Sequence, residues 1–154
     1  MSRYFYPLLV KADMISQTAE YALRSVVCLA SDPDAALITE EIAKITKVPR
    51  SYLSKVLQSL GRAGIVNARR GLHGGFSLAK PADELSLLEV INAVDPIPHI
   101  ETCPLGLRQH GVNLCPLHKR LNNAIALIEN AYRESTIGDL LREPTASKPL
   151  RETF

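Results

Sequence analysis

The stretch that decides the fold is "LITEEIAKITKVPRSYLSKVLQSLGRAGIVNARRGLHGGFSLAK", residues 37–80. It opens with a short helical pattern, for which Thr39 is the expected N-cap and the two glutamates after it suit the first turn. The segment "TKVP" breaks this helix. A second helix is expected to begin near Arg50 or Ser51 and to end around Gly64. Two helices joined by a short turn form a helix-turn-helix pattern.

The residues after the second helix indicate a β-hairpin. The segment "IVNARRGLHGGFSLAK", residues 65–80, contains a strand, a glycine-rich turn and a second strand, with Arg69, Arg70 and His73 on the arm or tip. The helix pair alone could equally be a generic hairpin with a solvated charged face. A helix-turn-helix followed by a β-wing, in contrast, is a nucleic-acid-binding architecture. The sequence therefore predicts a mainly α winged helix-turn-helix fold with a two-stranded β-wing.

The distribution of charge also points to a polyanionic partner. The chain has 18 basic and 16 acidic residues, but the segment from Lys47 to Lys80 contains seven Lys or Arg and no Asp or Glu. A contiguous cationic segment of this kind is suited to double-stranded DNA. The expected DNA contacts are polar and basic residues of the second helix and the wing: Arg50, Ser51, Tyr52, Ser54, Lys55, Gln58, Arg62, Arg69, Arg70 and His73.

These residue types match the two grooves of DNA. A recognition helix fits a major groove about 12 Å wide, where short polar and long basic side chains reach base edges and phosphates. Ser51, Lys55 and Gln58 are spaced to share one helix face. The wing glycines permit a close approach to the sugar-phosphate backbone, and Arg69 or Arg70 could enter the narrower minor groove. Binding through several phosphates predicts an affinity that falls steeply with salt.

Further helical patterns flank this segment. One precedes it in "SQTAEYALRSVVCLAS", residues 16–31, and one is expected to begin at Ser86 and end before Pro96. The longest runs from about Pro116 to Tyr132. Its apolar stripe could be a coiled-coil-like dimer interface or could pack on the core of the same chain. We favour a homodimer, because one winged helix reads only half of a two-fold operator. The stripe consists of Leu117, Leu121, Ala124, Ile125, Ile128 and Ala131.

The composition of the 154 residues is typical of a soluble protein. We expect an N-terminal extension in residues 1–13, the DNA-binding domain in residues 14–95 and a sensor loop in residues 96–115. The dimerisation helix and a terminal short helix should follow in residues 116–142, and a disordered tail in residues 143–154. The apolar run near the N-terminus is too short to span a bilayer and lacks the features of a secretory signal. We therefore expect a cytoplasmic protein with no membrane partner.

Three quoted segments carry a resemblance to a known family. "EYALRSVVCLA", the whole of residues 37–95 and the later "CPLH" resemble the IscR/NsrR-type winged-helix regulators, also called the Rrf-two family, over about residues 14–140. The resemblance implies a homodimeric transcription regulator, often a repressor. It also implies that DNA binding is controlled by an iron-sulfur cluster held in the loop before the dimerisation helix.

The cysteines of this loop match the family only in part. In several members three cysteines spaced five residues apart supply the thiolates, and here Cys103 and Cys115 occupy the outer two positions while Gln109 occupies the middle one. The resemblance suggests three substitutes: His118, His110 beside the vacant position, and Glu20, which corresponds to an acidic ligand from the partner's first helix. Two Cys and two His suit a [2Fe-2S] cluster, and zinc is the alternative.

Other interpretations of the loop stay open. Cys103 and Cys115 could instead form a metal-free thiol switch, or the loop could be structural in a constitutive regulator without a cofactor. Cys28 lies in the apolar run "SVVCLA" and is expected to be a small buried hydrophobic residue. An enzyme that uses a cysteine or a metal would need a base or oxyanion constellation, which the sequence does not offer. We assign no role to His99.

Overall fold

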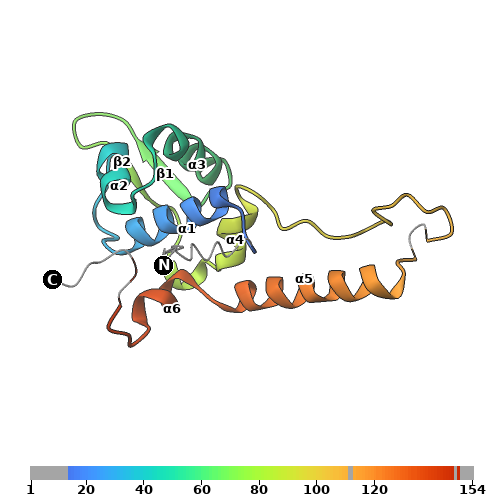
Figure 1. Cartoon of the computed structure of the whole chain (residues 1–154). Helices are drawn as coiled ribbons and strands as arrows, with labels where there is room; N and C mark the ends of the chain where they lie inside the picture. The colour runs from blue at the N-terminus through green and yellow to red at the C-terminus, as the bar shows by residue number, and fades with distance from the viewer. Residues whose placement is uncertain (1–13, 111–112, 148, 150–154) are drawn as a thin grey trace, which may run out of the picture.

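The computed structural model describes residues 14–110, 113–147 and 149 (Figure 1). The predicted N-terminal extension, residues 1–13, lies outside the described residues. Residues 148 and 150–154 of the predicted tail also lie outside them. The elements are α1 (Gln17–Ala30), α2 (Thr39–Thr46), α3 (Arg50–Arg62), β1 (Val66–Arg69), β2 (Gly75–Leu78), the short 3-10 helix η1 (Ala82–Glu84), α4 (Leu87–Asn92), α5 (Pro116–Glu134) and α6 (Ile137–Arg142). The predicted mainly helical fold with a two-stranded antiparallel sheet is confirmed.

Helix α1 lies at the centre of the core. It begins after Ser16, whose Oγ accepts a hydrogen bond from the Ala19 amide at 3.2 Å. Small and branched side chains such as Ala22 and Val26 are completely buried along it, so neighbouring elements approach closely. Helices α2, α3, α4 and α6 and strand β2 all contact α1. Cys28 is among the buried residues of this helix, as predicted.

The helix-turn-helix begins one residue earlier than predicted. Thr39 is the first residue of α2, and the N-cap is Ile38. The prediction of Thr39 as the cap was therefore wrong. Ile38 has no polar side-chain atom, and the backbone amide of Ile38 instead donates to the Glu41 carboxylate at 2.9 Å. The helix ends at Thr46, and the next residue, Lys47, has a left-handed φ of 57° that turns the chain toward α3.

The base of the wing forms backbone hydrogen bonds with a residue that precedes α2. In the β1–β2 hairpin Val66 pairs with Leu78 and Arg69 pairs with Gly75. Leu37 adds an antiparallel bridge, because its amide donates to the Phe76 carbonyl at 3.0 Å and its carbonyl accepts from the Phe76 amide at 2.8 Å. A Cβ on Gly75 would lie 2.8 Å from the Leu37 carbonyl oxygen, so only glycine permits this approach. This bridge fixes the base of the wing against the helix-turn-helix.

Residues 96–110 and 113–115 form a projecting arm together with α5 (Figure 1). The loop runs outward after α4, and α5, about 28 Å long for its 19 residues, runs back along it. The chain then rejoins the core through α6. The Ile137 amide donates to the Leu85 carbonyl at 2.9 Å, the Leu87 amide donates to the Ser135 carbonyl at 2.9 Å, and the Ile137 side chain is completely buried. Both ends of the arm are thus rooted in the winged-helix core.

Helix α5 has one partly covered face and one more open face, and none of its residues is fully buried. One face is partly covered and consists of His118, Asn122, Ile125, Glu129 and Tyr132. The other face is more open: Leu117 is 62% exposed and Leu121 is 48% exposed. The predicted stripe is therefore not uniformly exposed: Ile125 and Ile128 are partly buried, whereas its other members are exposed. Ile125 lies on the covered face. The remaining residues, of which only Ile128 is partly buried, follow the four-three spacing of a helix-pairing surface. We define them as the open seam: Leu117, Leu121, Ala124, Ile128 and Ala131.

Candidate DNA-binding face and cysteine–histidine loop

Helix α3 separates its apolar and polar residues cleanly. Leu53, Val56, Leu57 and Leu60 are buried on the inner side. All ten predicted DNA contacts, on α3 and on the wing, are exposed. Ser54 additionally donates through Oγ to the Arg50 carbonyl at 3.2 Å, which keeps its side chain on the helix. The inner side chains thus anchor α3, and its outer face is free for another molecule.

The cations of this face differ in whether they form an ion pair or a hydrogen bond with another side chain of the protein. Arg50 forms an exposed ion pair with Glu40, and Arg62 donates to the Ser59 hydroxyl at 3.3 Å. Lys55, Arg69 and Arg70 make no ion pair within the described part of the chain. An exposed ion pair such as Arg50–Glu40 contributes little to stability and can exchange for a phosphate contact. The surface therefore offers several cations to a polyanion at little cost.

An aromatic pair positions the N-terminal end of α3. The Tyr52 ring meets the Tyr21 ring of α1 edge to face, with centroids 6.1 Å apart. The Tyr21 hydroxyl accepts a hydrogen bond from Gln17 Nε2 at 2.8 Å, and the Arg24 guanidinium lies 5.8 Å from the centre of the Tyr21 ring. Tyr52 is still 55% exposed, so its ring is packed on one side and accessible on the other.

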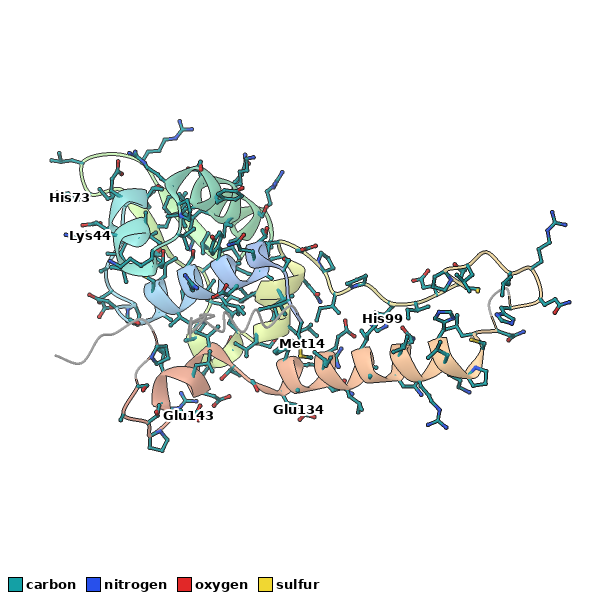
Figure 2. The ribbon with its side chains drawn as sticks, in the orientation of Figure 1. Met14, Lys44, His73, His99, Glu134 and Glu143 are labelled. Atoms are coloured by element: carbon teal, nitrogen blue, oxygen red, sulfur yellow. The ribbon has the colours of Figure 1, made fainter. Side chains whose placement is uncertain are left out.

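The tip of the wing is fully open to solvent. The amide of Gly74 donates to the Gly71 carbonyl at 2.9 Å and closes a tight turn. Leu72 is 96% exposed and His73 is also exposed. Figure 2 shows His73 at the opposite end of the molecule from the arm. The wing tip and the cysteine loop are therefore separate regions of the surface.

Two successive turns shape the loop that carries the cysteines. The Gly106 amide donates to the Cys103 carbonyl at 3.0 Å, and the His110 amide donates to the Leu107 carbonyl at 3.0 Å. The turns bring the Cys103 Sγ to 3.7 Å from His110 Nδ1. At the other end of the loop Cys115 is the N-cap of α5, and its Sγ lies 3.4 Å from Nδ1 of His118. Each cysteine thus has an imidazole beside it.

The two thiol–imidazole pairs are not joined into one cluster. Among the described residues no three His, Cys, Asp or Glu side chains come together in a metal-binding arrangement. The predicted ligand Glu20 lies on α1, where its carboxylate accepts from the Arg24 Nε at 3.0 Å. Gln109, at the position of the missing cysteine, is exposed. The donor atoms suit an iron-sulfur cluster or zinc, but within one chain they form two separate cysteine–histidine pairs.

The three thiols should differ sharply in reactivity. Cys28 is 4% exposed, and burial raises the pKa of its thiol to about 11, so roughly one molecule in ten thousand carries this thiolate near neutral pH. Cys115 is half-buried and Cys103 is 8% exposed. Brief treatment of metal-free protein with iodoacetamide should modify Cys115 first, Cys103 more slowly and Cys28 only after unfolding. Mass spectrometry of the peptides measures the order, and rapid labelling of Cys28 would contradict it.

One arrangement on the arm was missed from the sequence. His99 contacts two α5 residues: its Nδ1 lies 3.2 Å from Asn122 Oδ1, and its Nε2 lies 2.8 Å from Glu129 Oε2. The Ile100 amide donates to the same Asn122 oxygen at 2.8 Å. The only sequence signal is that Asn122 and Glu129 lie two helical turns apart on one face. These contacts bind the start of the loop to α5.

Comparison with known proteins identifies the family. The Rrf2 family, described as iron-dependent transcriptional regulators, matches residues 15–143. This chain belongs to the Rrf2 family. A relative of Aquifex aeolicus (strain VF5), an HTH-type transcriptional regulator by name, is 33% identical over 131 residues, which are 83% of this chain and 91% of the relative. The Rrf-two resemblance of the sequence is thereby confirmed.

Solved structures of other regulators share the Rrf2 fold. IscR of T. potens has a TM-score of 0.71 at 18% identity and covers 85% of this chain and 88% of its own. CymR, the global cysteine regulator of B. subtilis, has a TM-score of 0.69 at 22% identity, with coverages of 82% and 94%. An oxidised form of Staphylococcus aureus CymR has the same TM-score and identity, with coverages of 86% and 98%. At these identities the similarity concerns the fold.

Membership of the Rrf2 family has two consequences for the sequence predictions. The protein is a transcription regulator with a DNA-binding winged-helix fold, and the enzyme interpretation is set aside. In the described segments, no helix is both apolar enough and long enough to cross a bilayer. The roles of individual residues in binding DNA, a metal or a second copy of the chain are taken up as proposals below.

Proposed function

We propose that the protein is a homodimeric, sequence-specific DNA-binding repressor whose affinity for its operator is controlled at the loop that contains Cys103, Cys115 and His118. The observation that carries the DNA part is the exposed cationic face of α3 and the wing, where Lys55 and Arg70 lack ion-pair partners in the described chain. Each copy would place α3 in a major groove and the wing against the adjacent minor groove.

The open seam of α5 supports the homodimer. A 19-residue helix with no fully buried residue obtains only part of its stability from packing within one chain. The seam repeats apolar side chains at the spacing of paired helices, and Leu117 and Leu121 at its outer end are about half exposed or more. A second copy of the chain related by a two-fold axis would cover the same surface on both helices, as an isologous interface requires.

The donor set of the loop supports control by a cofactor. Cys103, His110, Cys115 and His118 would hold the group, with Glu20 of the second copy as the acidic candidate. Bound there, a [2Fe-2S] cluster would supply one-electron redox chemistry at a potential raised by imidazole ligation. Zinc, the other candidate, would supply a tetrahedral link. Because each pair offers two donors, binding requires the loop to bring the two pairs together.

Movement of the loop would reach the DNA-binding face through the arm. The arm is rooted in the core at α4 and α6, so a change at the loop alters the geometry between α5 and the winged-helix core. In a dimer, that geometry sets the separation of the two α3 helices. Operator half-sites lie about one helical turn, roughly 34–36 Å, apart, so a small change spoils their register.

Thiol oxidation without a cofactor is the second candidate. Cys103 and Cys115 each lie within 4 Å of a histidine nitrogen, which can accept the thiol proton and leave the reactive thiolate. Oxidation of the two thiolates to a disulfide would release two electrons to an oxidant and would close the loop. Disulfide formation would therefore change the conformation of the same arm without a bound cofactor.

Anaerobic purification followed by visible absorbance and analysis of iron, sulfide and zinc tests the cofactor. We expect coloured protein with equal iron and sulfide, loss of both in Cys115→Ser, and retention of both in the matched control Cys28→Ala. Colourless, metal-free wild-type protein would overturn the cofactor proposal. In that event, an operator affinity that changes on oxidation with diamide and recovers with dithiothreitol would favour the thiol mechanism.

A further inference from the structure

The start of the cysteine loop is held on α5 by a single imidazole with two partners. His99 lies between the loop and the helix, as Figure 2 shows. One ring nitrogen faces the Asn122 side chain and the other faces the Glu129 carboxylate, at 3.2 and 2.8 Å. The Glu129 side chain is only 17% exposed and that of His99 is 34% exposed, so the contact is partly shielded from water.

The orientation of the Asn122 amide is fixed by a third group. The Ile100 backbone amide, which can only donate, lies 2.8 Å from Asn122 Oδ1. The atom that also faces the Nδ1 of His99 is therefore the acceptor oxygen, and not the amide nitrogen. Rotating the Asn122 amide would place its NH2 group against the Ile100 N–H and break that hydrogen bond.

Both ring nitrogens of His99 consequently face acceptors. A neutral imidazole carries one N–H and can satisfy only one of them, whereas the imidazolium donates from both. In the neutral form a lone pair would face either the Asn122 oxygen or the Glu129 carboxylate. The observed arrangement is satisfied only when the ring is protonated.

We propose that His99, Asn122 and Glu129 form a protonation-dependent latch that holds the start of the cysteine loop against α5 and opens as the imidazole loses its proton. The latch is a positioning device and touches no proposed ligand. Because it deepens the control of the loop described above, its regulatory meaning rests on the proposed function. The latch itself depends only on the contacts within the arm.

The charges around His99 determine the direction of the pH dependence. The hydrogen bond to Glu129 raises the pKa of His99 above its ordinary value, and desolvation opposes it in part. The charge of Glu129, the hydrogen bond to Asn122 and the charge of Glu101 on the loop raise this pKa further. A raised pKa in the folded protein means that the latch is fully stabilising below the ordinary histidine value. It weakens as the pH rises through the folded value.

Two-dimensional NMR of the metal-free protein without DNA tests the latch. Over a titration from about pH 5 to about pH 9, the His99 ring should titrate with a midpoint above that of an unstructured histidine peptide. The Ile100 amide resonance should shift with the same midpoint. A ring that titrates at the peptide value, or an Ile100 amide that does not follow it, would overturn the proposal.

Two matched pairs of variants assign the partners. Glu129→Gln should lower the His99 midpoint toward the peptide value, whereas Glu134→Gln, on the same helix, should leave it unchanged. Asn122→Ala should accelerate hydrogen exchange at the Ile100 amide, whereas Asn123→Ala, one residue further along, should not. Equal effects of a variant and its control would refute the assignment. Because neither DNA nor metal is present, this result is independent of whether the proposed function holds.

Discussion

Leu121→Glu should convert the protein into a monomer and weaken its binding to a two-fold operator by about 100-fold to 10,000-fold. Leu121 lies within the open seam of α5, with 48% of its surface exposed in the single chain. An isologous interface along the seam would cover Leu121 of both copies with apolar side chains. Glutamates placed there would bury two unpaired carboxylates in an apolar contact, which costs several kcal/mol.

Light scattering during size-exclusion chromatography and titration of an operator selected from random duplex DNA would measure the two effects. The control is Asn123→Glu, which introduces the same charge on an exposed part of α5 away from the seam. It should remain dimeric and retain its affinity. A monomeric wild-type protein, or a dimeric Leu121→Glu variant with full affinity, would show that the second copy does not bind along the seam.

The elements of this fold could be predicted because their ends depend on local chemistry. Ser16 and Ser86 accept hydrogen bonds from the first turns of α1 and α4, and Pro116 is the first residue of α5. Each of these helix starts can be recognised within four residues of sequence. The error at Thr39 has the same origin. The pattern favours a polar cap, but the N-cap is the apolar Ile38, and of the two hydrogen bonds of a capping box only the one from the Ile38 amide to the Glu41 carboxylate can form.

The contacts missed from the sequence all join residues that are distant along the chain. The bridge between Leu37 and Phe76 is made by backbone groups, which leave no trace in a side-chain pattern except the glycine beside it. The stripe on α5 identified an apolar side but not its division. Which part is covered depends on where the loop lies, and that position is set by His99 and Asn122. Periodicity describes one helix and contains no information on its neighbours.

The same limit applies to the candidate ligands. The spacing of Cys103, His110, Cys115 and His118 shows that each cysteine has a histidine within reach, and the structure has these two pairs. The sequence could not show that the pairs are separate, because two tight turns and the start of α5 determine where each thiol lies. A joined four-ligand site was therefore an inference from residue types, and the pairwise arrangement is a property of the folded loop.

The double substitution Lys55→Ala and Arg70→Ala should reduce operator affinity by about 100-fold to 1,000-fold and make it less sensitive to salt. These cations lie on α3 and at the wing tip, and neither has an ion-pair partner among the residues described. Each phosphate contact contributes about 0.9 to the slope of log affinity against log salt concentration. A dimer loses four cations, so the slope should become shallower by up to roughly 3.6 if all four contact phosphates.

Fluorescence anisotropy at several salt concentrations gives the affinity and the slope together, and the control Arg133→Ala separates a local effect from a loss of net charge. Arg133 is an exposed residue of α5 and belongs neither to α3 nor to the wing. Its removal should change the slope by less than about 0.5, because a cation that does not contact a phosphate releases no counterion. Equal slopes for the double variant and the wild type would mean that α3 and the wing do not contact phosphates. A reduced affinity with an unchanged slope would instead indicate contacts to base edges, since only phosphate contacts release counterions.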